Sequence, residues 1–336
     1  MLRQFTVKGS DFEVGFGLGR MGADAAHRLL INHPFWAEVN APCHAAAVFR
    51  MKENTKMAFP RIWSEVEGMA AGLELPVDEV FAWNCRGDLL SSSPDGCTTV
   101  LVPGPVKTIG HNEDGFPFLK SECGLADVTS SSAPSLITFV YPASLPGHTF
   151  SLNGSGLVQT VNNIRLTNTR PEFPRMVLGR AVASSCDLDA ATDIIRRHSS
   201  SGGFHFTLAQ AGDPRLLSVE FGKGSAAVVE VATPQAHANH ALHAGSAFAG
   251  QIITESSHDR QIRAEALILD GADPLAILAD TAGPGLPIYR DQPDDPDDEN
   301  TIATLIAKVG PETVKWSVHT ARAKLADFRG EIVARR

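Results

Sequence analysis

The stretch SSSPDGCTTVLVPG (residues 91–104) separates two parts of the sequence that have different patterns. Its first half, SSSPDG, is a cluster of Ser, Pro, Asp and Gly that is typical of a turn or an exposed loop. Its second half begins at Cys97 and continues with the β-branched residues Thr98, Thr99 and Val100, which favour a strand. We therefore expect Cys97 to begin a strand where a flexible loop ends.

Before this stretch, residues 20–90 have the pattern of helices. In the segment RIWSEVEGMAAGLEL (61–75) the apolar side chains fall on one stripe, which contains Ile62, Val66, Met69, Ala70 and Leu73. The segment GFGLGRMG (15–22) looks like a glycine-rich phosphate loop, but it lacks the full fingerprint and a long preceding strand. These glycines therefore predict close packing between a strand and a helix.

After Cys97 the pattern changes to strands, as in CTTVLV (97–102) and the meander over 204–232. Helical segments interrupt at 187–198, at 256–270, where Ser256 and Asp259 are spaced like a capping box, and at 273–281. The tail over 314–334 is typical of one more hairpin. Strands and helices that come in such blocks predict antiparallel sheets with helices packed outside, which is an α+β layered fold.

The bulk composition excludes several classes of protein. With 336 residues, the chain is long enough for one large domain or two medium ones. A formal net charge of −9, without a tract rich in Lys and Arg, argues against nucleic-acid binding. The N-terminal residues lack the pattern of a secretory signal, and no run approaches the roughly 20 apolar residues of a membrane span. We therefore expect a cytoplasmic protein with neither a nucleic-acid partner nor a membrane partner.

The cysteines are odd in number and widely spread, with no CxxC pair: Cys43, Cys85, Cys97, Cys123 and Cys186. This distribution fits neither a disulfide framework nor a structural zinc site. We therefore expect at least one free thiol, and we expect no metal and no cofactor.

The position of Cys97 favours catalysis over simple burial. Gly96 leaves its own carbonyl sterically open, so the Cys97 thiol can add to it in an N-to-S acyl shift. Water then splits the thioester, which breaks the chain and frees an α-amine on Cys97. Such an amine titrates near 7.7 to 8.0 in model compounds, so it can act as the general base for its own thiol. The alternative is that Cys97 is a small buried hydrophobic residue, which is the commoner role of a cysteine.

The segment GHNEDGF (110–116) supplies further groups for such a site. The VPGPVK turn predicts a hairpin in which Asn112 and Asp114 approach Cys97 from the neighbouring strand. An ionised Asp114 could orient the Cys97 amine, and an asparagine amide suits a developing oxyanion. The commoner role of such residues is that of polar side chains at a turn or a strand end.

The segment HANHALH (237–243) has two interpretations. Its three histidines recur every three residues, which would place metal ligands on one face of a helix. However, the segment follows a strand and contains no carboxylate or cysteine that would complete a ligand set. Asn239 is the other candidate within it, as an oxyanion donor. The acidic run YRDQPDDPDDEN (289–300) indicates a solvated loop, because it lacks the spacing of a calcium loop.

Three motifs, DGCTT (95–99), GHNED (110–114) and HANH (237–240), together resemble the acyl-coenzyme A:6-aminopenicillanic acid acyltransferase family. This family is also called isopenicillin N acyltransferase-like, and it belongs to the N-terminal nucleophile hydrolases. The resemblance extends over nearly the whole chain and includes FEVGFGLG, EVEGMAAGLELPVDEVFAWNCR and LNGSGLVQTVNN.

The resemblance implies a four-layer αββα sandwich of two antiparallel sheets flanked by helices. It also implies self-cleavage between Gly96 and Cys97. Residues 1–96 would then form an α-chain and residues 97–336 a β-chain, and the two would stay associated as one folded domain.

The resemblance also implies roles for single residues. Cys97 would be the nucleophile for processing and for turnover. Asp114 would lie near its amine, and Asn239 would be the oxyanion-hole asparagine. The penicillin-forming members carry an arginine where this chain has Thr301 or its neighbours, which argues against a penicillin-nucleus substrate.

The chemistry implied by the resemblance is attack on an amide or thioester, followed by transfer of the acyl group to water or to an amine. We expect hydrolysis of a small N-acylated amine or amino acid, with acyl transfer to an amine acceptor as the alternative. The candidate substrate-binding residues are Arg86, His111, Phe116, Phe204 and His205. A third interpretation, a zinc-binding or non-catalytic protein with a structural Cys97, predicts an intact chain. A homo-oligomer is left open.

Overall fold

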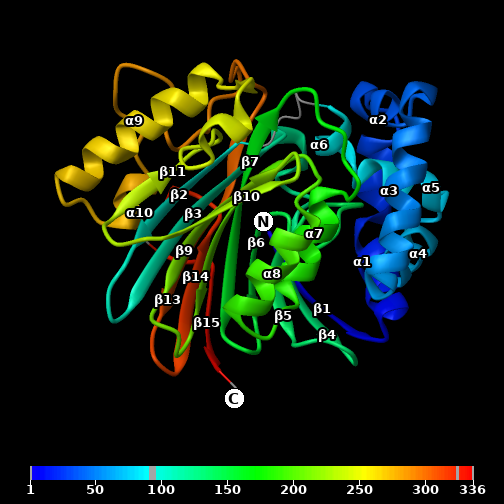
Figure 1. Cartoon of the computed structure of the whole chain (residues 1–336), viewed down its shortest axis with the longest axis horizontal. Helices are drawn as coiled ribbons and strands as arrows, with labels where there is room; N and C mark the ends of the chain where they lie inside the picture. The colour runs from blue at the N-terminus through cyan, green and yellow to red at the C-terminus, as the bar shows by residue number, and fades with distance from the viewer. Residues whose placement is uncertain (1, 91–95, 323–324, 335–336) are drawn as a thin grey trace.

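Two β-sheets pack face to face and carry helices on their outer surfaces (Figure 1). The computed structural model describes residues 2–90, 96–322 and 325–334. The helices α9 and α10 cover one sheet, and α7 and α8 cover the other, so that four layers result. The predicted α+β sandwich is therefore confirmed. The expected loop over 91–95 lies outside the described residues.

The larger sheet has nine strands among the described residues, with the order β1-β4-β5-β6-β7-β8-β9-β10 and with β12 paired to β7. The strand β1 runs parallel to β4, and the other paired strands are antiparallel. The strands are β1 (Arg3–Gly9), β4 (Gly124–Ser130), β5 (Leu136–Val140), β6 (Phe150–Asn153), β7 (Leu157–Leu166), β8 (Gly203–Gln210), β9 (Leu216–Gly222), β10 (Ser225–Glu230) and β12 (Gln251–Ile252).

The smaller sheet has six antiparallel strands among the described residues, in the order β11-β2-β3-β13-β14-β15. They are β11 (Gln235–His237), β2 (Cys97–Val102), β3 (Lys107–Gly115), β13 (Asn300–Val309), β14 (Thr313–His319) and β15 (Phe328–Val333). The predicted strand that begins at Cys97 and the predicted C-terminal hairpin are both confirmed.

The helices form three groups. The first is α1 (Asp11–Ala25), α2 (Pro34–Val39), α3 (Ala45–Ala58), α4 (Pro60–Leu73), α5 (Val77–Trp83) and α6 (Arg86–Leu89). The second is α7 (Arg175–Ala183) and α8 (Leu188–His198), and the third is α9 (Glu255–Leu269) and α10 (Pro274–Leu278). Short helical turns lie at Ala26–Leu30, Pro42–His44, Pro117–Leu119 and Gly245–Phe248.

Among the described residues, several hydrophobic clusters hold the layers together. The largest joins the first helical group to the apolar side chains between the sheets, such as Leu101 of β2 and Phe139 of β5. A second fills the space between β7–β9 and the helices α7 and α8. A third lies between α9 or α10 and the outer face of the smaller sheet, where Val100 contributes. Alternate residues of β2 thus serve the inter-sheet core and the outer helices.

The glycines of the segment GFGLGRMG lie inside α1 rather than in a strand-to-helix turn. Cβ atoms built on Gly15 and Gly19 would lie 1.9 and 2.3 Å from backbone oxygens of α4. Reciprocally, a Cβ on Gly68 of α4 would lie 2.0 Å from the Phe12 carbonyl oxygen of α1. The expected close packing is therefore real, but it joins two helices, because small residues on both let their backbones approach.

Three further features bear on expectations from the sequence. The cap of α9 is Thr254, whose side chain accepts from the Ser257 amide, and not Ser256 as the capping-box spacing predicts. None of the five cysteines, all of which the structure describes, takes part in a disulfide. Among the described residues, the helices are too short or too polar to cross a membrane.

The contact between α1 and α4 predicts the effect of one methyl group. We expect Gly15→Ala to lower the free energy of unfolding by roughly 2–3 kcal/mol, because the added carbon would overlap the Glu65 carbonyl. On an exposed helix the same change would stabilise by up to about 1 kcal/mol. Chemical denaturation measures the difference. The exposed control Ala71→Ser in α4 should change stability by about 0.5 kcal/mol or less, and a stabilised Gly15→Ala would contradict the packing.

Candidate active site

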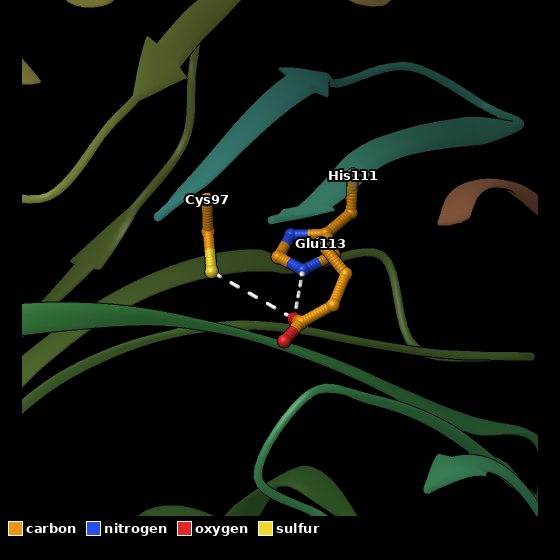
Figure 2. Close-up of side chains that lie close together, drawn as sticks. All are labelled: Cys97, His111 and Glu113. Atoms are coloured by element: carbon orange, nitrogen blue, oxygen red, sulfur yellow. Dashed lines mark hydrogen bonds and ion pairs between the residues drawn. The ribbon is translucent and has the colours of Figure 1, made fainter. Parts of the chain in front are cut away.

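Cys97 is the first residue of β2 and lies directly opposite Glu113 of β3. Because side chains alternate along a strand, Cys97 and Thr99 of β2 and His111 and Glu113 of β3 all point into the space between the sheets. Figure 2 shows that Cys97, His111 and Glu113 converge on one point. All three are buried, with 4% of Cys97, 0% of His111 and 5% of Glu113 exposed.

Glu113 is the centre of this group. Its Oε2 lies 3.7 Å from Cys97 Sγ and 3.4 Å from His111 Nε2 (Figure 2). Its other oxygen, Oε1, accepts a hydrogen bond of 2.8 Å from the hydroxyl of Tyr141, which directly follows β5 of the larger sheet. The Tyr141 bond fixes the carboxyl group, so that Oε2 faces both the sulfur and the imidazole.

A chain of hydrogen bonds sets the imidazole of His111. Asn162 Nδ2 donates to the His237 carbonyl oxygen, so Asn162 Oδ1 is free to accept the Thr99 hydroxyl at 2.7 Å. Thr99 Oγ1 must then accept from His111 Nδ1, which is 2.8 Å away. Complete burial lowers the pKa of His111 to about 3, because it disfavours the charged ring. We therefore assign the neutral tautomer whose Nε2 lone pair faces Glu113.

The backbone of Cys97 is held from the other side. Its N–H donates to Asn239 Oδ1 at 2.9 Å, and its carbonyl oxygen accepts from Arg260 Nη1 at 2.6 Å. Arg260 Nη2 also donates to Asn239 Oδ1 at 2.7 Å, and Asn239 Nδ2 donates to the Asn163 carbonyl oxygen. The structure thus places Asn239, which the sequence predicts as a site residue, directly on the amide of Cys97.

Gly96 lies in a tight and charged environment. Its carbonyl oxygen accepts from the Asp114 backbone N–H at 2.9 Å. A Cβ on Gly96 would lie 2.2 Å from Glu299 Oε2, and Glu299 is buried and bound by Arg290 at 2.6 Å and Arg165 at 3.3 Å. A larger residue at position 96 would therefore displace an ion pair.

The carboxyl group of Asp114 is buried beside this junction. Its Oδ1 accepts from the Thr301 hydroxyl at 2.6 Å, and its Oδ2 has no hydrogen-bond partner among the described residues. Burial raises the pKa of Asp114, although the charges of Arg260 and Arg290 oppose the shift. Asp114 lies next to Gly96 rather than on the Cys97 sulfur, because it points to the face of β3 opposite to Glu113.

The acidic run 289–300 folds around its own arginine. Arg290 is fully buried and donates to Asp295, Asp297 and Glu299. Its backbone also exchanges two bonds with Thr301, where the sequence comparison expects an arginine in penicillin-forming enzymes. The run is exposed over much of its length, as expected, but its last two residues are buried. Every ion pair that the structure gives Arg290 is with this chain's own carboxylates.

The register of the hairpin differs from one expectation. Asn112 does not face the thiol. Its Nδ2 donates to the Leu278 carbonyl oxygen at 2.8 Å, and its Oδ1 accepts from Thr304 at 2.6 Å, on the side of α10. A shift of one residue reverses the face that a side chain occupies, so Glu113 takes the place that Asn112 and Asp114 were expected to share.

The predicted substrate-binding residues occupy different places. His111 belongs to the Cys97 group, and His205 reaches it through Asn162, whose Oδ1 lies 3.0 Å from His205 Nδ1. Phe204 is packed in the core between the larger sheet and α7–α8. Phe116 lies 5.0 Å from Phe118, centroid to centroid.

Arg86, the remaining substrate-binding candidate, is buried. It donates to the Trp83 carbonyl oxygen and to Ser144. A binding role for these five residues stays a prediction.

The histidine run does not form a helix. His237 ends β11 and stacks on His205 at a centroid distance of 3.5 Å, while its Nε2 lies 3.1 Å from Glu220 Oε1. His240 instead bonds to Ser257, and His243 to Ser218. The three rings thus have separate partners. Among the described residues, the group whose donor atoms all lie within 4.8 Å of one another, and which could hold a metal ion, is Cys97, His111 and Glu113.

Sequence reasoning did not single out Glu113, Arg260 or Arg290. The sequence did contain a signal for Glu113. In one of the possible registers of the antiparallel hairpin, Cys97 pairs with Glu113, the third residue of HNED. Arg260 lies 163 residues from Cys97 in the sequence, and nothing in its own segment marks it.

The sequence also matches a known protein family. The family model described as "Acyl-coenzyme A:6-aminopenicillanic acid acyl-transferase" matches residues 103–323. The chain belongs to this family. The predicted resemblance is therefore confirmed, and the matched region includes β3, Asn239 and Arg260.

Two curated proteins are similar to this chain. The beta-alanyl-dopamine/carcinine hydrolase of Drosophila melanogaster is 26% identical over 217 residues, which cover 56% of this chain and 56% of that protein. The acyl-coenzyme A:6-aminopenicillanic-acid-acyltransferase 40 kDa form of Emericella nidulans is 28% identical over 159 residues, covering 46% of this chain and 43% of that protein. The chain thus spans about half the length of the curated relatives it matches.

The contacts of Arg260 predict a strong effect on stability. We expect Arg260→Met to lower the free energy of unfolding by about 3–5 kcal/mol, because it would leave the buried carboxyl groups of Asp114 and Glu299 with less positive charge. The control Arg263→Ala, in the same helix, removes a partly exposed ion pair with Asp280 and should cost about 1 kcal/mol or less. Denaturation curves of both variants test this; equally small losses would contradict the buried role of Arg260.

Proposed function

We propose that this chain is a self-processing cysteine amide hydrolase, with Cys97 as nucleophile. One observation carries the proposal. Cys97 begins a strand directly after Gly96, and its backbone N–H is bound by Asn239 Oδ1 at 2.9 Å while its sulfur faces a buried polar group. Any buried backbone N–H needs an acceptor, but here the acceptor is the side chain of Asn239 and the adjacent thiol faces a buried carboxyl group, as a positioned N-terminal nucleophile requires.

The proposed processing step is an N-to-S acyl shift. The Cys97 sulfur attacks the carbonyl carbon of Gly96, the bond from that carbon to the Cys97 nitrogen breaks, and the thiol proton ends on the released nitrogen. Water then hydrolyses the thioester, which leaves a carboxylate on Gly96 and restores the thiol. The Asp114 N–H, 2.9 Å from the Gly96 oxygen, is a donor for the negative charge that develops there.

After cleavage the same contacts would serve turnover. Asn239 Oδ1 would hold the new α-amine of Cys97, which acts as base for the sulfur. A second hydrogen of the Asn239 amide would stabilise the oxyanion of an incoming substrate, as the sequence predicts. Asp114, in its ionised form, would contribute negative charge beside the Gly96–Cys97 junction. In the intact chain Cys97 is only 4% exposed, so access of a substrate to the sulfur would require a rearrangement after cleavage.

The two halves of the cleaved chain would remain one folded unit, with residues 1–96 and 97–336 as the α- and β-chains. The strand β1 of the first half pairs with β4 of the second over seven residues. The helices α1 and α4 also share a hydrophobic cluster with strands of both sheets. These contacts do not depend on the Gly96–Cys97 bond.

The substrate class that we favour is a small N-acylated amine or amino acid. The name of the Drosophila relative, a hydrolase of beta-alanyl-dopamine and carcinine, supports amide hydrolysis. The Emericella relative supports the alternative, acyl transfer to an amine. The ion pairs of Arg290 with three acidic side chains argue against a site for a penicillin carboxylate at Thr301. A product assay with and without added amine separates hydrolysis from transfer.

The mass of the purified protein tests the proposal first. We expect two fragments, the second beginning at Cys97, that elute together in gel filtration. Cys97→Ala should remain one intact chain, since it lacks the sulfur. The control Cys186→Ser, at an exposed cysteine, should be cleaved like the wild type. A wild-type chain that stays folded and whole after long incubation would refute self-processing.

Variants of Asn239 test its two proposed contacts. We expect both Asn239→Ala and Asn239→Asp to reduce turnover of an acyl amide by about 10²–10³-fold, because neither has the amide donor for the oxyanion. The exposed control Asn32→Ala should keep wild-type turnover, and circular dichroism verifies that each variant is folded. If Asn239→Asp has near wild-type turnover, the oxyanion role of the Asn239 amide is refuted. Asn239 would then act only as an acceptor for the Cys97 nitrogen.

A further inference from the structure

We propose that Cys97, His111 and Glu113 form a binding site for a zinc-type divalent ion, which holds the nucleophile in an inactive state. Figure 2 shows the three side chains pointing at one another from β2 and β3. Their sulfur, nitrogen and oxygen donor atoms lie within 4.8 Å of one another. Binding of the ion stands on this geometry alone, while its effect on activity rests on the proposed function.

The distances from Glu113 Oε2 to the other two donor atoms fit a tetrahedral zinc ion. With zinc bonds of about 2.3 Å to sulfur and about 2.0 Å to nitrogen or oxygen, a tetrahedron has edges of roughly 3.5 Å for S···O and 3.3 Å for N···O. The structure has 3.7 Å between Cys97 Sγ and Glu113 Oε2, and 3.4 Å between His111 Nε2 and the same oxygen. These two distances are within a few tenths of an ångström of the tetrahedral values, and the third pair, Cys97 Sγ and His111 Nε2, lies within 4.8 Å.

The arrangement of acceptors calls for a positive species between the side chains. His111 Nε2 presents a lone pair, because Nδ1 carries the hydrogen that Thr99 Oγ1 accepts. A carboxylate oxygen at Glu113 Oε2 would also be an acceptor, so the contact between the two atoms needs a proton or a cation. A divalent ion can replace that proton together with the proton of Cys97, and both protons pass to the buffer. One thiolate and one carboxylate then neutralise its charge.

The surroundings orient the ligands as they do in known metal sites. The second nitrogen of His111 is bound by Thr99 at 2.8 Å, and the second oxygen of Glu113 by Tyr141 at 2.8 Å. Such outer bonds set the ring and the carboxyl group before an ion arrives. Sulfur and imidazole nitrogen select zinc-type ions over Mg²⁺ and Ca²⁺, which take oxygen ligands.

Three protein ligands leave a fourth position open, as in zinc sites that admit water. The sulfur that binds the ion is the sulfur that would attack Gly96 or a substrate. An ion at this site therefore blocks both self-cleavage and turnover, and its removal by a chelator restores them. The site thus gives the enzyme a reversible control by zinc.

Cobalt(II) provides a spectroscopic test on the full chain. The protein is treated with a chelator, desalted and titrated with Co²⁺ alone until the spectrum no longer changes. We expect one equivalent to produce a thiolate-to-cobalt charge-transfer band and the strong visible bands of a four-coordinate ion. Zn²⁺ should remove these bands, whereas Mg²⁺ should not.

Variants separate the proposed site from other ligands. Cys97→Ala should abolish the charge-transfer band, while Cys186→Ser and Cys43→Ser, at exposed cysteines, should leave it unchanged. Glu113→Gln should weaken Co²⁺ binding by at least 10-fold, and Tyr141→Phe, which removes only an outer bond, by about 10-fold or more. A band that survives Cys97→Ala, or a folded wild type that binds no Co²⁺, would overturn the proposal.

Cleavage assays on the same samples test the metal site and the proposed self-processing separately. We expect Zn²⁺ added to freshly prepared intact protein to slow cleavage at Gly96–Cys97 at least 10-fold, with recovery after chelation. If cleavage proceeds equally with bound Zn²⁺, the proposed inhibition by zinc is refuted, whereas self-processing is still supported. Cobalt binding in a chain that never cleaves would support the metal site and refute self-processing.

Discussion

The pairing of β2 with β3, in the register that sets Cys97 opposite Glu113, is the constraint on which the candidate site depends. It places Cys97, Thr99, His111 and Glu113 between the two sheets, where all four are buried. The same pairing turns Asn112 and Asp114 outward to α9 and α10. One register therefore separates the groups around the sulfur from those around the Gly96 carbonyl, although His111, Asn112, Glu113 and Asp114 are consecutive in the sequence.

Buried charged side chains surround the Gly96–Cys97 junction. Arg260 links the Cys97 carbonyl oxygen, Asn239 and Ser256, and Arg290 binds three carboxylates of its own loop. Replacing buried ion pairs by apolar side chains often costs little or even stabilises, so stability alone does not explain such a network. What Arg260 supplies is position, because it binds the Cys97 carbonyl oxygen and also Asn239, which accepts from the Cys97 N–H.

The sequence predicted the strand that begins at Cys97, the hairpin to GHNED, the α+β class and the family. These features depend on neighbours in the chain, such as β-branched residues after a turn, and local patterns report them well. It did not predict the role of Glu113 or the outward position of Asn112, since both depend on a register that alternation alone leaves open. The histidine run was ambiguous for a related reason: its three rings bind partners on β9 and α9, which no spacing reveals.

By itself, the sequence determined that Cys97 follows a glycine at the start of a strand, and that the chain resembles a family of N-terminal nucleophile hydrolases. Only the tertiary structure decided what surrounds this cysteine. Glu113 comes from the adjacent strand, Asn239 from the segment after β11, and Arg260 from a helix 163 residues away. Contacts between such distant segments arise when apolar faces of sheets and helices are buried together, and the polar groups carried into that core must then find each other.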